Sequence, residues 1–523
     1  MINKFPNVRQ FEWTLGGKKL LAEKQDSVRI AILVTIAFAI GVYLIATTVL
    51  ITKDGVFYIE QAQNFLTDPI SIIKEHPPGY PILIFVAHKL ITLLGISTST
   101  STQTWIYCAQ GVSLLCRLLA ITSLYFIGKT LVGSERSFWA VLILIILPYP
   151  AEFGSDIIRE WPHVMFLTWG MLFLIHGAKQ NKWWSFGLAG ITAGLGYTIR
   201  PECAQIVLYG ILWLVYGLLR FRQNNMSKLK LGMALIILLA GFSIAAGPYI
   251  KASGDILPQT LKEFLTFIQQ RLAQKIQMIN ISNNTCIYTA VGLPCNVFRA
   301  ISELIKTISE NLFYFFAFAL AIGIYRHSQR KSRIMDPERF FVYSFIITNI
   351  GMLIILYCFR QNMSRRHCLP LVVFLIFYVP DGLQAIADFL TNRLKGKSRM
   401  EQNSRKYFFV LLLAGCIICL PKLIKPMRVD KKSYRDAAEW LNKNTAPAAI
   451  IATPDSRISF YAERKYLGYL EDYEQISEQV NYIVKIVKTE NKKIASDKNL
   501  TEEYSTWTDN KKNKKLIIYR TSQ

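Results

Sequence analysis

Residues 30–51 read IAILVTIAFAIGVYLIATTVLI, an apolar run that contains no charged side chain. A helix needs about 20 consecutive apolar residues to cross the hydrocarbon core of a bilayer. Comparable runs recur as far as residue 421, with short polar loops between them, and 52% of the 523 residues are hydrophobic. The sequence therefore predicts a polytopic α-helical membrane protein with a polar tail that folds in water.

Basic residues indicate the orientation of the chain. Residues 1–29 are polar, hold more basic than acidic residues, and are not followed by a small-residue cleavage site. We therefore expect a cytoplasmic N-terminus and an uncleaved signal anchor. Further basic clusters occur at 220–230, 326–339 and 391–406. Because the formal net charge of +25 gathers in such loops, it indicates membrane topology rather than nucleic-acid binding.

The basic clusters also decide which apolar runs span the membrane. A span at 81–95 would leave all three clusters outside, whereas an interfacial helix at 79–96 places all of them in the cytoplasm. About eleven spans follow, with approximate limits of 30–51, 104–128, 137–150, 162–177, 183–199, 203–219, 231–250, 309–325, 340–358, 368–388 and 407–421.

Three domains follow from this topology: a cytoplasmic segment 1–29, a membrane domain 30–425 and an extracytoplasmic domain 430–523. The outer face then holds the long loops 52–103, 151–161, 251–308 and 359–367. The tail reads as a small α/β domain, with helices within 433–444 and 457–463 and strands within 448–454, 465–470, 481–487 and 515–521. It shows no phosphate loop or catalytic triad, so we expect it to cap the site, to bind a partner or simply to pack.

The first outer loop places Asp54 just beyond the first span. Asp54 is a candidate catalytic carboxylate, and a helix-capping role is the alternative. The prolines of His76-Pro77-Pro78-Gly79-Tyr80-Pro81 make a stiff turn that could hold Lys74 and His76 against lipid head groups, or merely start a helix.

The second outer loop holds Asp156, Arg159 and Glu160 just before the next span. On a helix Asp156 and Glu160 would share a face, which suits either a paired-carboxylate site or a surface ion-pair cluster. Arg200 lies at a tight outer turn, where an arginine at a membrane boundary often meets phosphate.

Arg365 and Arg366 belong to a basic cluster on the outer side, against the positive-inside bias. Such a cluster suits binding of a lipid phosphate or pyrophosphate. The alternative role is anchoring of the chain to anionic head groups. The cysteines and histidines show no zinc pattern, and Cys286 and Cys295 could form a disulfide in the long outer loop.

Three sets of residues carry a resemblance to a known family: Asp54-Gly55 with Tyr58 and Ala62, His76-Pro77-Pro78-Gly79-Tyr80-Pro81, and Gly194-Leu195-Gly196-Tyr197 running into Arg200-Pro201-Glu202. With them the chain resembles the bacterial GT-C membrane glycosyltransferases, the superfamily of the dolichyl-phosphate-mannose protein mannosyltransferases and the lipid A aminoarabinose transferase. The resemblance is best over residues 50–202. Beyond them it rests on Arg365-Arg366-His367 ahead of Leu369-Pro370, and on Pro454-Asp455-Ser456-Arg457 with Phe460-Tyr461-Ala462.

The resemblance implies a bacterial inner-membrane enzyme that takes a sugar from a polyprenyl-phosphate donor at the outer face. It implies an essential acidic residue in the first outer loop, here Asp54. Many relatives have Asp-Glu there, and Gly55 departs from that pattern, which makes Asp156 or Glu160 the candidate second carboxylate.

The cations that would stabilise the leaving phosphate are Arg159, Arg200 and Arg365 or Arg366, with Lys74 and His76 on the lipid head group. A divalent metal at the carboxylates is compatible with this superfamily. The acceptor is a lipid, a glycan or a protein. The alternatives are a transporter or lipid flippase, which would place ionisable residues at mid-membrane, and an assembly protein in which Asp54 would be dispensable.

Overall fold

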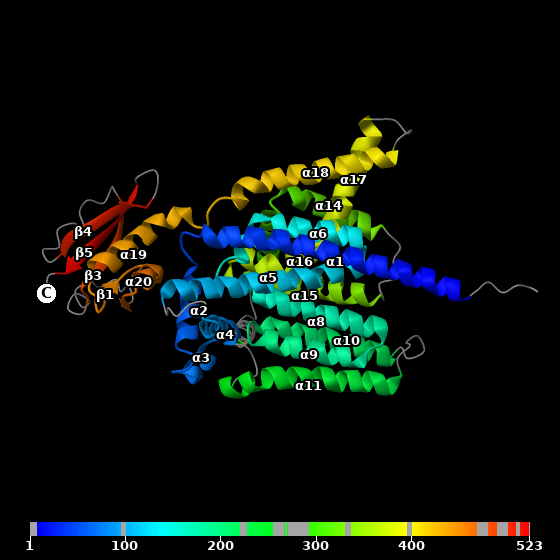
Figure 1. The fold of residues 1–523 in the computed structure, drawn as a ribbon, viewed down its shortest axis with the longest axis horizontal. Helices are drawn as coiled ribbons and strands as arrows, with labels where there is room; N and C mark the ends of the chain where they lie inside the picture. Colours follow the sequence, from blue (N-terminus) through cyan, green and yellow to red (C-terminus); the bar gives the residue numbers. More distant parts are fainter. Residues whose placement is uncertain are drawn as a thin grey trace, which may run out of the picture. The chain divides into compact units, whose positions relative to one another are not determined.

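A computed structural model describes residues 8–95, 101–219, 227–254, 292–329, 336–394, 400–467, 480–488, 500–508 and 513–521, together with residues 266 and 269. Helices dominate these residues (Figure 1). The α-helices outside the tail are α1 (Val8–Ala46), α2 (Lys53–Gln63), α3 (Pro69–Glu75), α4 (Gly79–Leu93), α5 (Thr102–Val132), α6 (Ser134–Ile146), α7 (Pro148–Phe153), α8 (Glu160–Gln180), α9 (Trp183–Tyr197), α10 (Gln205–Leu219), α11 (Lys228–Ser253), α13 (Gly292–Asn311), α14 (Phe315–Ser328), α15 (Pro337–Arg360), α16 (Arg365–Leu375), α17 (Val379–Leu394) and α18 (Met400–Leu423).

The chain is a polytopic α-helical membrane protein. Among the described residues seven helical stretches are long and apolar enough to cross a bilayer: Lys24–Ala46, Thr102–Val132, Pro201–Leu219, Lys228–Ser253, Pro337–Arg360, Arg365–Arg393 and Asn403–Leu423. A bent pair of helices would bring the number to eight. Helices α6, α8 and α9 coincide with three further expected spans but do not meet this criterion of length and composition. Helix α4 is also too short to count, and its interfacial position stays a prediction.

The bent pair corrects one expected span. A continuous helix over 309–325 is wrong, because α13 ends at Asn311 and α14 begins at Phe315. Phe313 and Tyr314 between them have φ angles of 55° and 56°, a backbone region that a helix cannot contain. The two helical axes consequently differ by 115°.

The described residues fall into two compact units. Unit 1 comprises the described residues within 1–40, 116–151 and 162–423, and unit 2 comprises those within 41–115, 152–161 and 424–523. Two of the loops predicted to lie outside keep the names first and second outer loop. Their described residues, except Ala151, belong with the tail to unit 2.

Glycines let α9 and α11 of unit 1 pack closely (Figure 1). A Cβ atom on Gly190 would collide with the carbonyl oxygen of Leu238, and one on Gly194 would lie 2.8 Å from the carbonyl oxygen of Phe242. Small residues allow helix backbones to approach in this way inside a membrane. The packing fixes the end of α9, from which the chain turns into the 3-10 helix η1 (Pro201–Ala204).

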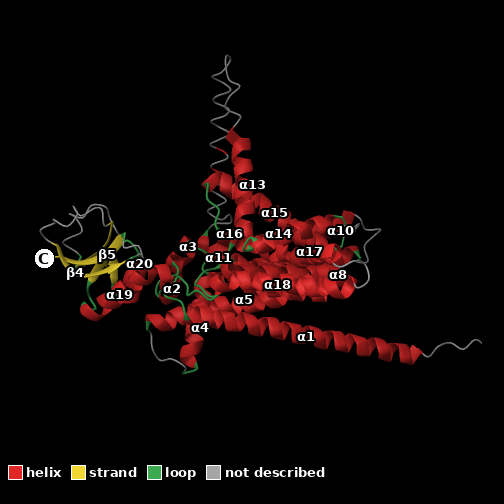
Figure 2. Cartoon of the chain, turned by 90° about the horizontal axis from the view of Figure 1, so that it is seen from above, coloured by secondary structure: helices red, strands yellow, loops and turns green. Residues whose placement is uncertain are grey.

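The tail of unit 2 is an α/β domain that begins with the 3-10 helix η5 (Val429–Lys431). Its other elements are α19 (Lys432–Asn444), β1 (Ile450–Ala452), α20 (Ser456–Ala462), β2 (Lys465–Leu467), β3 (Tyr482–Lys488), β4 (Leu500–Trp507) and β5 (Lys514–Thr521). The strands form one sheet in the order β2-β1-β3-β5-β4, parallel across β2-β1-β3 and antiparallel across β3-β5-β4. Helices α19 and α20 pack against it (Figure 2).

The hydrophobic core of the tail contains one residue from far away in the sequence. Leu50, which follows α1, is fully buried among Tyr434, Leu441, Ile458 and the sheet residue Ile518. The residues that lead into the first outer loop are thus anchored inside the tail.

Candidate functional site

Asp54 lies in the first turn of α2 and is exposed. The capping residue of this helix is Thr52, whose side-chain oxygen accepts a hydrogen bond from the backbone N–H of Gly55 at 3.1 Å. The alternative role for Asp54, a helix cap, is therefore wrong. A carboxylate in the first turn of a helix gains from the helix dipole.

Gly55 makes a close approach possible between the two outer loops. A Cβ atom at this position would lie 3.0 Å from the Cβ atom of Ile157 and 3.0 Å from the Oγ1 atom of Thr52. A glutamate, as in the Asp-Glu pattern, would force one of these neighbours to move. Close packing thus explains why glycine, rather than the glutamate of the Asp-Glu pattern, follows Asp54.

The second outer loop does not form the helix that the spacing of its carboxylates suggested. Residues 154–159 adopt turns and bends, and α8 begins only at Glu160. Asp156 and Glu160 therefore do not share a helical face, and that expectation is wrong. Both are buried, with Glu160 in the first turn of α8.

Asp156 forms an ion pair with Arg428, which lies just before the tail domain. Its Oδ1 atom also accepts hydrogen bonds from the backbone N–H groups of Thr52 at 3.3 Å and Ile157 at 2.9 Å. Arg428 in turn donates to the carbonyl oxygen of Leu50 at 3.0 Å. The pair joins both outer loops to the start of the tail.

A second buried ion pair holds the same stretch of backbone. Arg457 donates two hydrogen bonds to Asp455, at 2.8 and 2.7 Å, and a third to the carbonyl oxygen of Ile51 at 3.1 Å. The hydroxyl of Tyr461 accepts from the N–H of Ile51 at 3.3 Å. Lys53 approaches Asp455 at 3.7 Å.

We call residues 50–52 the entry segment and the pairs Asp156–Arg428 and Asp455–Arg457 the arginine clamp. The clamp ties polar backbone groups of the entry segment to fixed side chains. Because Asp54 follows two residues later, the clamp restrains the backbone from which its side chain extends. A fixed backbone is what a catalytic carboxylate needs to keep its geometry.

The arginine clamp favours the charged forms of Asp455 and Arg428. Burial opposes ionisation of Asp455, but hydrogen bonds from Arg457 outweigh it and hold the pKa of Asp455 below its usual range. Burial also opposes the charge of Arg428, and Asp156 outweighs it to raise the pKa of Arg428. Since the pKa of Asp455 is depressed in the folded state, its contribution to stability is complete above about pH 4 and is lost only as the pH falls through the folded value.

His76 and Arg159 lie near one another although they come from different loops. Partial burial, followed by the positive charge of Arg159, lowers the pKa of His76 below its usual range. The ring of His76 packs edge-on against Phe57 of α2, with the ring centres 5.1 Å apart. Lys74 lies in the last turn of α3, two residues before His76, and is exposed. We call Lys74, His76 and Arg159 the basic group; the lowered pKa of His76 favours its neutral form at pH 7.

The remaining candidate cations belong to unit 1. Arg200 is buried and lies at the turn between α9 and η1, where its N–H donates to the carbonyl oxygen of Gly196 at 2.8 Å. Arg365 begins α16, stacks over the ring of Tyr149 at 4.1 Å and approaches Glu310 at 3.8 Å. Arg366 follows it in the first turn of α16 and is partly buried.

Two further predictions concern a metal site and a disulfide. In the part of the chain that the structure describes, no three histidine, cysteine, aspartate or glutamate side chains gather closely enough to hold a metal ion. The expected disulfide falls on Cys286, outside the described residues, and on Cys295, whose side chain is not described, so it stays a prediction.

Arg428 is the residue that sequence reasoning missed. One signal was available, because Lys422, Lys425 and Arg428 form a basic run just after the last span, on the side predicted to be outside. Arg428 also has a φ angle of 57°, which a non-glycine residue adopts only when its surroundings hold it there.

Comparison with known proteins gives a family match over part of the chain and a shared fold. Residues 75–245 match the family model described as dolichyl-phosphate-mannose-protein mannosyltransferase. A search of curated protein sequences gives no match.

Two solved structures are similar over most of the chain. ArnT from Cupriavidus metallidurans bound to undecaprenyl phosphate has a TM-score of 0.56 at 10% identity, covering 94% of this chain and 97% of its own. The oligosaccharyltransferase AglB from Archaeoglobus fulgidus, with an inhibitory peptide and a dolichol-phosphate, has a TM-score of 0.53 at 13% identity, covering 89% of this chain and 69% of its own. Both are GT-C glycosyltransferases, so the expected fold is confirmed, and neither match supports the transporter alternative.

Proposed function

We propose that this chain, a membrane glycosyltransferase with the GT-C fold, transfers a sugar from a polyprenyl-phosphate donor to an acceptor at the outer face of a bacterial inner membrane. The observation that carries the proposal is Asp54, an exposed carboxylate in the first turn of α2 behind a clamped backbone. A carboxylate held in this way suits proton abstraction from an acceptor hydroxyl or amine.

The reaction we propose is a displacement at the anomeric carbon of the donor sugar. Asp54 accepts the proton of the attacking acceptor group while the bond to the lipid phosphate breaks. Negative charge builds up on the leaving phosphate, so fixed cations lower the barrier. In unit 2, Arg159 and Lys74 supply positive charge, and neutral His76 supplies a hydrogen-bond donor.

Asp156 takes a different role from the one its charge first suggested. It forms the ion pair with Arg428 and accepts the N–H of Thr52, so we assign it to positioning of the entry segment. Glu160 remains the proposed second carboxylate, because it is buried in the first turn of α8, beside Arg159 in the sequence.

Arg200, Arg365 and Arg366 of unit 1 are proposed as further contacts of the donor phosphate. We expect Arg200→Lys to raise the KM for the donor about tenfold, because an ammonium keeps the charge but loses the two-pronged hydrogen bonding of a guanidinium. Steady-state kinetics with a polyprenyl-phosphate sugar measure this. Arg393→Lys, an exposed position at the end of α17, is the matched control. A donor KM that stays at the wild-type value in Arg200→Lys would remove Arg200 from the site.

The proposed orientation has a cytoplasmic N-terminus and an outer tail. Fusions of an alkaline phosphatase or a fluorescent reporter at Lys230, Arg333 and Gln523 test it. We expect cytoplasmic signals at Lys230 and Arg333 and an extracytoplasmic signal at Gln523, because only this arrangement keeps the basic clusters inside. An extracytoplasmic signal at Lys230 would contradict both the orientation and the site.

Deletion of the gene tests which envelope molecule receives the sugar in the cell. Mass spectrometry of envelope lipids, glycans and proteins, with and without the gene, should show the loss of one sugar substituent and its return on complementation. Complementation with Asp54→Asn should not restore it. An unchanged envelope in the deletion strain, or full restoration by Asp54→Asn, would argue against the proposed function.

A further inference from the structure

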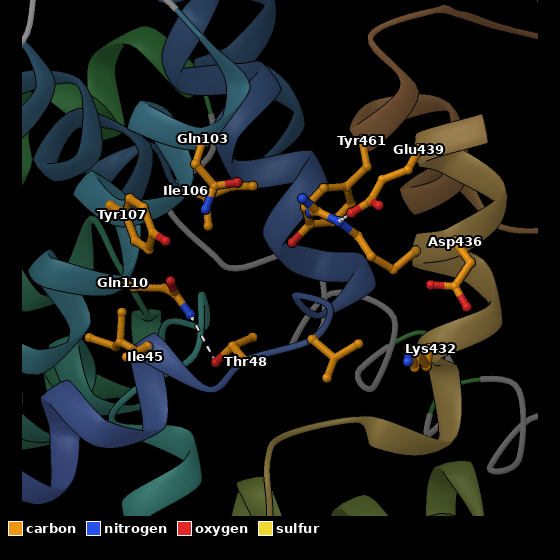
Figure 3. A pocket seen from close by; sticks show the side chains of 13 residues that line it. Ile45, Thr48, Gln103, Ile106, Tyr107, Gln110, Lys432, Asp436, Glu439 and Tyr461 are labelled. Atoms are coloured by element: carbon orange, nitrogen blue, oxygen red, sulfur yellow. Dashed lines mark hydrogen bonds and ion pairs between the residues drawn. The ribbon is translucent and has the colours of Figure 1, made fainter. Parts of the chain in front are cut away.

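Unit 2 contains a cavity of about 420 Å³ that is separate from Asp54 and the basic group around His76 (Figure 3). Side chains of α5 lie on one side of it and side chains of α19 lie on the other. The lining includes Ile45, Ala46, Ile106 and Tyr107 at the ends of membrane spans, and Lys432 and Asp436 on α19.

One part of the lining comes from the ends of two membrane spans. Ile45 and Ala46 close the span Lys24–Ala46, and Ile106 and Tyr107 lie in the first turns of the span Thr102–Val132. Tyr107 is 52% exposed, as is typical of a tyrosine at the level of lipid head groups. The cavity therefore lies where the hydrocarbon core gives way to water.

The α19 side of the cavity carries two positive and two negative residues. Arg435 is already engaged, because it donates to Glu439 at 2.8 Å and stacks over the ring of Tyr461 at 4.2 Å. Lys432 and Asp436 differ from this pair. Among the described residues neither side chain has an ion pair or a hydrogen bond, although both line the cavity (Figure 3).

The helical geometry of α19 sets the distance between the charges of Lys432 and Asp436. Lys432 and Asp436 are one helical turn apart, so their side chains leave the same face of the helix about 5–6 Å from each other at Cβ. A phosphate joined to a primary ammonium by a short ethanolamine link offers opposite charges at a similar separation. The phosphate suits Lys432, and the ammonium can donate hydrogen bonds to the carboxylate of Asp436.

We propose that this cavity binds the head group of a bilayer phospholipid of the phosphatidylethanolamine type. The balanced charge of the α19 wall disfavours a purely anionic lipid. We call Ile45, Ala46 and Ile106, at the ends of two spans, the apolar floor of the cavity. The apolar floor favours a lipid over a free zwitterion in water, because these side chains can cover the acyl-chain side of a lipid. A trimethylammonium group has no N–H to donate, so phosphatidylcholine should bind less well.

The test is native mass spectrometry of the purified full-length chain, reconstituted in nanodiscs of phosphatidylglycerol with an equal share of phosphatidylethanolamine or phosphatidylcholine. We expect the wild type to retain phosphatidylethanolamine about threefold more often than phosphatidylcholine, as for one partly exposed ion pair. Asp436→Asn should abolish this preference. Lys432→Gln should lower the retention of both lipids.

Matched controls lie on the same domain outside the cavity. Lys443→Gln on α19 and Glu503→Gln on β4 remove the same kinds of charge and should leave lipid retention unchanged. Equal retention of the two lipids by the wild type would overturn the proposal, as would an unaltered preference in Asp436→Asn.

Free phosphoethanolamine, added at millimolar concentration, separates a lipid from a soluble ligand. It should not displace the retained lipid, since it lacks the acyl part that meets the apolar floor. Displacement by the free compound would show that the cavity takes a soluble zwitterion and would overturn the lipid assignment. None of these readouts depends on sugar transfer, so they stand apart from the proposed reaction.

Discussion

Asp54→Asn is expected to lower kcat for sugar transfer by roughly a hundredfold to ten-thousandfold, the range over which general-base groups act. The substitution keeps the volume of the side chain but removes the charge that accepts a proton. Thr52, not Asp54, caps α2, so asparagine should leave the helix intact. Expression, membrane insertion and thermal unfolding should therefore match the wild type.

A matched control distinguishes catalysis from surface charge. Glu60→Gln removes an exposed carboxylate from the same helix and should retain near wild-type kcat. If Asp54→Asn keeps wild-type turnover while both proteins insert normally, the proposed role of Asp54 is wrong.

Arg457→Met is expected to cause the second large effect, through the entry segment. It leaves Asp455 buried without its bidentate partner, and breaking a buried pair in this way costs about 3–5 kcal/mol. The carbonyl oxygen of Ile51 also loses its donor. We expect kcat to fall by at least about tenfold while the donor KM changes little, because Asp54 is displaced but the donor contacts remain.

Hydrogen exchange reports on the segment directly. Backbone amides of residues 50–55 should exchange faster in Arg457→Met, whereas those of β5 should keep their protection if the tail remains folded. The double variant Asp455→Asn, Arg457→Met should recover part of the lost stability, since no unpaired charge remains. Arg520→Lys, an exposed change on β5, is the control. Unchanged exchange at residues 50–55 would refute a positioning role for Arg457.

Local patterns predicted much of the fold. Apolar runs with basic loops identified most of the membrane helices, and the short apolar segments of the tail identified β1, β2, β3 and β5. The two helices of the tail were also predicted. Strand β4 was missed because its sequence LTEEYSTW places two glutamates side by side and shows no clean alternation of apolar and polar residues. Its place at the edge of the sheet explains this, since an edge strand can expose much of its length.

The candidate site was predictable only in part. Asp54 and the basic residues around His76 became candidates from their positions in the first loops. The partner of Asp156 could not, because Arg428 lies 272 residues further along the chain. Residue spacing suggested a helix through 156–160, but the contacts with Thr52 and Arg428 favour an irregular loop there.

The most direct test of the proposed reaction is a transfer assay with the purified chain in proteoliposomes. A radiolabelled polyprenyl-phosphate sugar is added with an extract of envelope lipids, glycans and proteins as acceptors, and released polyprenyl phosphate and labelled product are measured together. We predict that the wild type consumes the donor, forming both in equal amounts, and that Asp54→Asn forms neither. Intact donor with the wild type, under conditions in which the chain is folded and correctly oriented, or equal turnover by Asp54→Asn, would contradict the proposed reaction.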